Sequence, residues 1–183
     1  MASKIKVDQI QTADGTGTIA LQNQLSGMTT ASLPALGSAQ MPTGSLLQVV
    51  SDTANRAAAT TSTSWSATGV TATITPSSTS SKILATYHSG ICYQDNQLGW
   101  YGHFTIYRGS TNLGRSSDGL TGHYLNTQSA NDVGFAVSCQ VLDSPNSTSA
   151  LTYTVQWAVN NTSARMVHDL SGESTITLME IAG

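Results

Sequence analysis

Aromatic, amide and charged side chains gather in two turn-rich stretches of the chain, where they could recognise a polar partner. The first stretch spans residues 90–104 and carries Tyr93, Asp95, Asn96, Gln97, Trp100 and Tyr101. The second spans residues 113–133 and carries Arg115, Asp118, His123, Tyr124 and Asn126. Aromatic rings beside carboxamides suit the faces and hydroxyls of sugars, and loops on a rigid scaffold commonly carry recognition. We therefore predict that both stretches contact a glycan or protein partner.

One aromatic pair in these stretches has a second interpretation. Aromatic residues are also enriched at the centres of subunit interfaces, so Trp100 and Tyr101 could pack against another copy of the chain. Other aromatic residues alternate with polar ones and are predicted to lie in the core, namely Phe135, Tyr153 and Trp157. The sequence leaves both interpretations of Trp100 and Tyr101 open.

The residue patterns of common enzymes are absent from this sequence. There is no GxSxG nucleophile motif and no GxxxxGK[ST] phosphate-binding loop. The two glutamates, Glu173 and Glu180, lie near the C-terminus, and the eight aspartates sit singly, mostly beside turn residues. We therefore predict a protein that is not an enzyme, with no catalytic residues and no cofactor.

Metal-ligand spacing is also missing. The histidines, at positions 88, 103, 123 and 168, show no HxH or HExxH pattern, and we predict no metal site. One alternative is a histidine near a three-fold axis, where three imidazoles would meet. The acid-containing pairs at residues 95–96, 118–119 and 131–132 are typical of turns rather than of calcium sites. Cys92 and Cys139 lie in apolar stretches and are expected to be buried free thiols, with a disulfide as the alternative in an oxidising compartment.

The composition argues against two classes of partner. Charged residues make up 9% of the 183 residues, and the net charge is −3. The seven Lys and Arg residues are scattered, so no basic stripe could neutralise a row of phosphates, and we expect no nucleic-acid binding. No apolar run reaches the roughly 18 residues of a membrane span, so we expect no membrane insertion. The polar surface is built instead from 25 Ser and 26 Thr, which favour sheets over helices.

Alternating apolar and polar residues predict a series of strands. The clearest runs are residues 133–141 and 151–159, in which every second residue belongs to one apolar face. Further strands are expected near residues 46–50, 70–74, 83–93, 101–108 and 174–183, and residues 53–62 could form one short helical turn. Seven or eight strands joined by turns predict an all-β fold, an antiparallel and jelly-roll-like β-sandwich over residues 46–183.

The first 28 residues predict a separate assembly or anchoring segment. Two apolar runs flank a turn at residues 14–17, and their members are Ile5, Val7, Ile10, Ile19, Leu21 and Leu25. An isolated two-stranded hairpin is marginal in water, so these side chains need a surface to bury them. We predict that other copies of the chain or another protein supply it, with folding back onto the sandwich as the alternative. Residues 29–45, which contain two prolines, are predicted to be a linker.

Several blocks of the sequence carry a family resemblance. They are GSLLQVVS, TSTSW, GVTATITPSSTSSKILA, IYRGSTNLG, CQVLDSP, STSALTYTVQ and STITLMEIAG, in this order, preceded by SKIKVDQIQTADGTGTIALQNQLSGM. Together they resemble the N-terminal repeat and C-terminal β-sandwich module of tail-fibre and other virion structural proteins of tailed bacteriophages, marine ones especially. The chain departs from those proteins in having a shaft of only about one repeat.

The resemblance implies a function and an oligomeric state. Such a module is a structural and adhesive domain, usually a homotrimer, located in the virion and assembled in the host cytoplasm. We expect a fibre-type or spike-type appendage for host attachment, in which residues 1–28 contact other virion proteins. The alternative is a capsid decoration or head-fibre protein that binds the coat shell. A free carbohydrate-binding module is a third interpretation, but it leaves residues 1–28 without a role.

Overall fold

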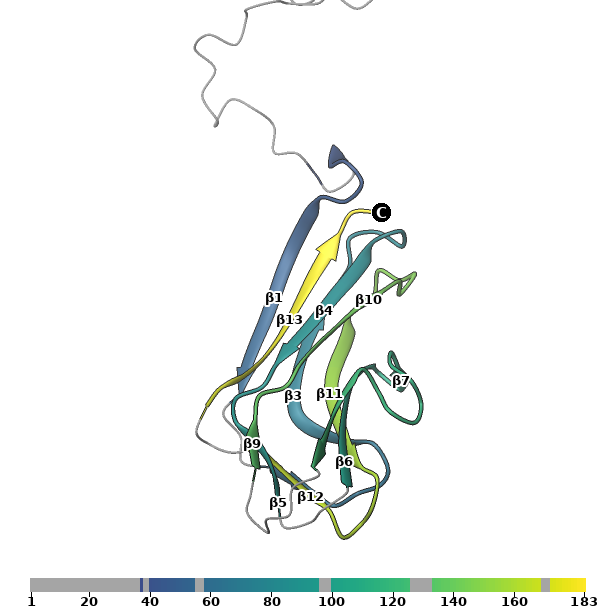
Figure 1. Cartoon of the computed structure of the whole chain (residues 1–183). Coiled ribbons are helices and arrows are strands. Elements are labelled where there is room, and N and C mark those ends of the chain that lie inside the picture. The colour runs from purple at the N-terminus through teal and green to yellow at the C-terminus, as the bar shows by residue number, and fades with distance from the viewer. Residues whose placement is uncertain (1–36, 38–39, 55–57, 96–99, 126–132, 169–171) are drawn as a thin grey trace, which may run out of the picture. The chain divides into compact units, whose positions relative to one another are not determined.

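The computed structural model describes residues 37, 40–54, 58–95, 100–125, 133–168 and 172–183. Residues 37–183 form one compact unit, shown in Figure 1. Its strands, in chain order, are β1 (Leu46–Ala54), β2 (Ala58–Thr60), β3 (Ser66–Ile74), β4 (Lys82–His88), β5 (Cys92–Asp95), β6 (Trp100–Arg108), β7 (Thr111–Asn112), β8 (Thr121–Leu125), β9 (Val133–Phe135), β10 (Ser138–Asp143), β11 (Leu151–Val159), β12 (Arg165–His168) and β13 (Ser174–Ile181).

The strand order is that of a jelly roll. One sheet, called sheet A here, has the order β1-β13-β4-β10, and the second, sheet C, has the order β3-β11-β6-β7 with β8 also paired to β6. Without the two-residue strand β7, the two sheets contain eight strands. If these eight strands are renumbered from 1 to 8 in chain order, sheet A has the order 1-8-3-6 and sheet C has the order 2-7-4-5. These are the strand orders of a jelly roll, which consists of two Greek keys. All the strand pairs that the structure describes are antiparallel. The prediction of an all-β antiparallel sandwich is therefore confirmed.

A third sheet closes one end of the sandwich. Sheet B has the order β2-β12-β5-β9, and each of its strands lies in a different connection between the two main sheets. β2 follows β1, β5 follows β4, β9 follows β8 and β12 follows β11, so all four connections meet at one end, called the tip here (Figure 1). The start of β1 and the finish of β13 pair with each other at the other end, called the base.

The core is made by the alternation that the sequence predicted. The inward faces of sheets A and C bury the largest side chains completely, and these include Ile74, Ile83, Tyr87, Phe104, Ile106, Tyr153, Trp157, Ile176 and Leu178. On β11, Tyr153, Val155, Trp157 and Val159 are buried as expected. Both cysteines are also buried, and both are free thiols.

Two predicted strands are each divided into two. The run at residues 83–93 breaks into β4 and β5, and the run at residues 133–141 breaks into β9 and β10. The breaks face each other, because the Ser89 amide donates to the Val137 carbonyl at 2.8 Å and the Val137 amide donates to Ser89 Oγ at 2.7 Å. Gly90 allows the bend, since a Cβ there would lie 2.6 Å from the Gly172 backbone. Each strand leaves sheet A at this point and continues in sheet B.

At the start of the sandwich one local prediction is wrong and another is confirmed with longer bounds. Residues 58–60 form strand β2 rather than part of a helical turn, because they pair with β12. The strand predicted at residues 46–50 is confirmed as part of the longer β1, and its Leu46 and Val49 side chains are 54% and 52% exposed. Within the predicted linker, Gly44 donates its amide to the Ala182 carbonyl at 2.7 Å. Residues 1–28 and their six apolar side chains lie outside the described residues.

Candidate functional site

Three ring-bearing side chains form an exposed surface on the outer face of sheet C, near the tip. Tyr101 on β6 lies directly opposite Tyr124 on β8, and their ring centroids are 4.4 Å apart with 29° between the planes. His103 lies two residues along β6, with its ring 5.7 Å from that of Tyr101 and nearly parallel to it. Tyr101 is 44% exposed and Tyr124 is 43% exposed. We call Tyr101, His103 and Tyr124 the aromatic shelf.

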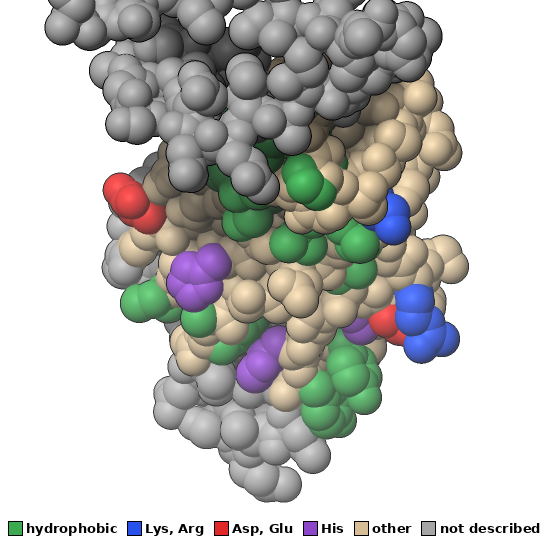
Figure 2. Space-filling model, turned by 90° about the horizontal axis from the view of Figure 1, so that it is seen from above, with side chains coloured by type: hydrophobic (Ala, Val, Ile, Leu, Met, Phe, Trp, Pro, Cys, Tyr) green, Lys and Arg blue, Asp and Glu red, His purple; other side chains and the backbone are tan. Residues whose placement is uncertain are grey.

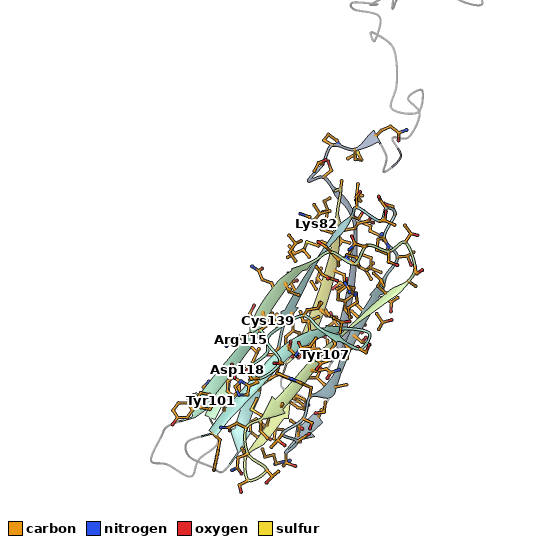
Figure 3. All side chains as sticks on the ribbon, turned by 90° about the vertical axis from the view of Figure 1, so that its right-hand side faces the viewer. Lys82, Tyr101, Tyr107, Arg115, Asp118 and Cys139 are labelled. Carbon is orange, nitrogen blue, oxygen red and sulfur yellow. The ribbon has the colours of Figure 1, made fainter. Side chains whose placement is uncertain are left out.

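The loop between β7 and β8 adds charged groups beside this shelf. Arg115 and Asp118 approach each other to 4.0 Å, and both side chains are largely exposed. With the aromatic shelf they line a shallow hollow of about 510 Å³, whose floor includes Leu120 and Thr121. Tyr101, Asp118 and Arg115 lie along one side of the sandwich in Figure 3. The hollow thus combines flat rings with one cation and one anion.

Hydrogen bonds hold the β7–β8 loop in place. The Asn112 side-chain oxygen accepts from Thr105 Oγ1 at 2.6 Å and from the Gly114 amide at 2.9 Å. Arg115 and Gly119 exchange two backbone hydrogen bonds, of 3.0 and 2.9 Å. Gly119 has a φ of +67°, and a Cβ there would lie 2.4 Å from the Phe104 carbonyl oxygen. The backbone beneath the hollow is therefore formed before any partner arrives.

The Trp65 side chain also supports the β7–β8 loop, although Trp65 itself lies elsewhere in the chain, just before β3. Its indole Nε1 donates to the Ser116 carbonyl at 3.0 Å. Its ring would also lie 2.7 Å from a Cβ placed on Gly119, so indole and loop are in close contact. This bond ties the segment before β3 to the rim of the hollow.

The electrostatics of the shelf favour a neutral imidazole. Burial lowers the pKa of His103, while the Asp118 charge and a hydrogen bond to the Asp118 backbone oppose this shift without cancelling it. His103 is therefore uncharged at neutral pH. Arg115 and Asp118 are then the charged groups among the residues lining the hollow, and their charges balance.

The structure brings together four of the eleven residues predicted from the sequence to contact a partner. Tyr101, Arg115, Asp118 and Tyr124 line one hollow although they come from both predicted stretches. Tyr93 lies instead on β5, in sheet B, and is half-buried. Trp100 packs against the core. The side chain of Asp95, and residues Asn96, Gln97 and Asn126, lie outside what the structure describes.

His123 takes a different position from its neighbour Tyr124. Its ring stacks on Phe135 of β9 at 4.0 Å and 14°, beside a separate cleft of about 210 Å³ between β8 and β10. Burial lowers its pKa, and its buried Nε2 has no hydrogen-bond partner among the described residues. The His123 and Tyr124 side chains lie on opposite faces of β8, because adjacent residues on a strand point to opposite faces.

The shelf residue that sequence analysis missed is His103. It was considered only as a scattered histidine without metal-ligand spacing. The signal that identifies it is its distance of two residues from Tyr101 on one predicted strand, which places both side chains on the same face.

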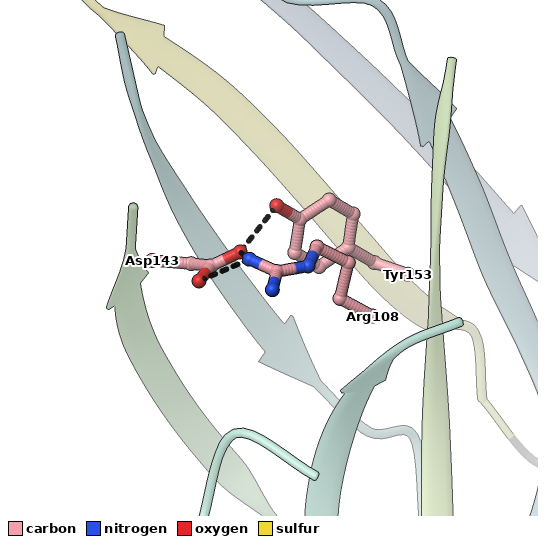
Figure 4. Close-up of polar contacts among 3 residues, drawn as sticks. All are labelled: Arg108, Asp143 and Tyr153. Carbon is pink, nitrogen blue, oxygen red and sulfur yellow. Dashed lines mark hydrogen bonds and ion pairs between the residues drawn. The ribbon is translucent and has the colours of Figure 1, made fainter. Parts of the chain in front are cut away.

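Most of the sequence blocks that carry the family resemblance contribute a residue to one of two buried polar clusters. In the first, Asp143 accepts from Arg108 Nη1 at 2.7 and 2.6 Å and from Tyr153 Oη at 2.7 Å, as Figure 4 shows. These residues come from the blocks IYRGSTNLG, CQVLDSP and STSALTYTVQ and join sheet A to sheet C. Burial and the neighbouring Asp143 raise the pKa of Tyr153, so its hydroxyl remains a donor.

The second cluster surrounds Glu180, which is fully buried at the base. Its Oε1 accepts from the Ser77 amide, Ser77 Oγ and Ser81 Oγ, each at 2.7 Å, and its Oε2 accepts from Gln48 Nε2 at 2.5 Å. Burial alone would raise the pKa of Glu180, but these hydrogen bonds outweigh it and lower the pKa. The blocks containing TPSSTSSK and ITLMEIAG thus meet at one carboxylate, which holds strands together.

The described residues contain neither a candidate metal-binding group nor a helix that could span a membrane. No group of three or more His, Cys, Asp or Glu side chains among them is arranged to hold a metal ion. Within the same residues, no helix has the length and apolar character needed to cross a membrane. Charged side chains are few on the face in Figure 2, where one acidic and one basic side chain lie next to each other at the right edge.

Comparison with known proteins gives distant structural likenesses. No protein-family model matches the sequence, and no curated protein does so either. The chain is similar to the crystal structure of the infectious bursal disease virus VP2 subviral particle, with a TM-score of 0.32, 10% identity, and coverage of 82% of this chain and 42% of that chain. It is similar to the structure of the Gx strain of that virus, with a TM-score of 0.34, 13% identity and the same coverage. This chain thus spans less than half the length of either match, and its jelly-roll assignment depends on the strand order alone.

Proposed function

We propose that this chain is a non-enzymatic virion structural protein of a tailed bacteriophage, and that its jelly roll attaches the particle to the host surface. The observation that carries the proposal is that the chain enters and leaves the sandwich at one end, while the sheet B connections lie at the other end. The chain enters β1 and leaves β13 at the base, whereas the four connections of sheet B lie at the tip (Figure 1) and Tyr101 of the aromatic shelf lies towards that end (Figure 3). A module held at its base would present the shelf to the surroundings.

The resemblance of the sequence blocks to phage tail-fibre proteins supports this proposal. It also supports a homotrimer, in which residues 1–28 join the copies to one another or to other virion proteins. A trimer would present three shelves, and several weak contacts on one particle gain strength from multivalency. Light scattering on the full chain tests the trimer, because three copies of a 19.0 kDa chain give about 57 kDa. A truncated chain without residues 1–43 that still contains three copies per particle in solution would rule out assembly through the N-terminal segment.

A second candidate function, decoration of the capsid, is favoured by the outer face of sheet A. Four apolar side chains follow one another across its strands in register: Val49, Met179, Leu84 and Leu142. Val49 and Leu142 are each 52% exposed. A partly apolar face, with Lys82 as an exposed charged residue on the same side of β4, suits packing against a shell protein. In that case sheet A would be the binding surface and the shelf would need no partner.

Immunogold labelling of intact particles separates the two candidates. Antibodies raised against the purified chain are applied to phage particles and viewed by electron microscopy. Attachment predicts label on the tail or its fibres, and decoration predicts label over the head. Label in neither place, with the chain absent from purified particles by mass spectrometry, would rule out a virion protein.

A further inference from the structure

We infer that the aromatic shelf and the Arg115–Asp118 pair bind a neutral saccharide, an inference that rests on the proposed attachment role. The C–H face of a sugar ring packs against the exposed parts of the stacked Tyr101 and Tyr124 rings, while its hydroxyls bond to the two charged side chains. The hollow of about 510 Å³ lies within the range of about 300–1,000 Å³ that is usual for small-ligand sites.

The stacking surface is distinct from the rest of the outer face of sheet C. Further along that face lie threonines bonded to one another across strands, such as Thr71 with Thr154 at 3.2 Å and Thr73 with Thr152 at 2.8 Å, and Tyr107, which does not line the hollow. The shelf instead has two large rings that stack on each other and are still 44% and 43% exposed. A pyranose has a flat face of C–H bonds, and burying that face against aromatic rings removes apolar surface of both partners from water.

The rim supplies the polar half of the site. Arg115 and Asp118 are 4.0 Å apart, and their side chains are 82% and 53% exposed, so most of their bonding capacity is unused. The guanidinium has five N–H donors and the carboxylate four lone-pair positions, which suits a ligand whose hydroxyls both donate and accept.

The charge balance of the hollow selects a neutral sugar. An acidic sugar would gain an ion pair with Arg115 but would be repelled by Asp118 only 4.0 Å away, and an amino sugar would meet the opposite conflict. His103, kept uncharged by burial, adds no third charge. A protein partner fits less well, because the site is a hollow with a hydrogen-bonded rim rather than a broad surface of the usual interface size.

Saturation-transfer NMR on the full chain tests the inference. The probes are the methyl glycosides of glucose, galactose, mannose and N-acetylglucosamine, with methyl glucuronide as the acidic comparison. We expect at least one neutral glycoside to bind, with the largest transfer to ring C–H protons. Replacing Tyr101→Ala or Tyr124→Ala should weaken binding by at least about tenfold, and Asp118→Ala should weaken it as well.

Tyr107→Ala provides the matched control. Tyr107 lies on the same strand and faces outward, but it does not line the hollow, so its replacement should leave affinity within about twofold of the original. Thermal melting of each variant shows that it is folded. Binding that is equal in Tyr101→Ala and Tyr107→Ala would overturn the site, and binding of the glucuronide alone would overturn the neutral class.

The outcomes also separate this inference from the proposed attachment role. If none of the five glycosides binds while gold label lies on the tail, the saccharide site is overturned and attachment through another ligand stands. If a neutral glycoside binds at the shelf while label covers the head, the site stands and the attachment role is overturned.

Discussion

The same three residue types occur in two regions of this protein with opposite results. Inside the sandwich, Arg108, Asp143 and Tyr153 are joined by hydrogen bonds of 2.6–2.7 Å. At the hollow, Arg115 and Asp118 are 4.0 Å apart beside an exposed Tyr101. In the buried set the Asp143 carboxylate accepts from both partners, whereas the exposed set retains most of its donors and acceptors. Residue type therefore does not distinguish a structural cluster from a binding site, but the remaining bonding capacity does.

Removing the buried carboxylate should have the largest effect. Asp143→Ala leaves Arg108 and Tyr153 without their shared acceptor in a place where water is scarce, and we expect the free energy of unfolding to fall by about 3 kcal/mol. Asp118→Ala removes the exposed counterpart and should change it by less than about 0.5 kcal/mol. Urea titrations of both variants measure the difference. Equal losses would contradict the contrast between the two regions.

The stability that the buried Glu180 cluster contributes is expected to depend on pH. Because folding lowers the pKa of Glu180, the unfolded chain binds more protons near that pKa. The stabilisation by its carboxylate is therefore present above the ordinary pKa of 4.5 and is lost as the pH falls below it through the lowered value.

Glu180→Gln should accordingly lower the free energy of unfolding by about 2 kcal/mol at pH 7. The difference in unfolding free energy between the variant and the original chain should become smaller in acid. The exposed Glu173→Gln is the control, and it should lie within about 0.5 kcal/mol of the original at every pH. Urea titrations from pH 7 to pH 3 give both curves. A Glu180→Gln gap that widens in acid would show that the sign of the pKa shift is wrong.

Removal of a single hydroxyl sharpens the comparison further. Tyr153→Phe deletes one donor to the buried Asp143 carboxylate, and we expect a loss of about 1 kcal/mol in unfolding free energy. Tyr101→Phe deletes a hydroxyl from a ring that is 44% exposed, and its effect should stay below about 0.5 kcal/mol. Thermal melts of the two variants, made side by side, test this ranking.

The smallest expected effect concerns the cysteines. Burial raises the pKa of Cys92 and of Cys139 to about 11, so both thiols are protonated and shielded in the folded protein. We expect neither to react with a thiol reagent at pH 8, and both to react after unfolding in urea. Rapid modification of either thiol in the folded state would contradict their place in the core.

Much of the sandwich follows from local patterns, and some of its most informative parts do not. Alternation along β11 predicted its buried face because period-2 spacing depends only on neighbouring residues. The division at Ser89 and at Val137 could not be predicted from alternation, since the apolar pattern continues through both breaks. The bends depend on a hydrogen-bonded contact between residues 48 positions apart. Sheet B was missed for the same reason.

By itself, the sequence determined the all-β class, the inward faces of the long strands and the aromatic stretches, because composition and spacing act locally. Only the tertiary structure decided which of these side chains meet. It paired Tyr101 with Tyr124, turned His123 onto Phe135, and brought Arg115 and Asp118 beside the shelf. Such groupings depend on strand register and on the order of strands in the jelly roll, because both bring together segments that are distant in the chain. The packing of the whole core specifies them.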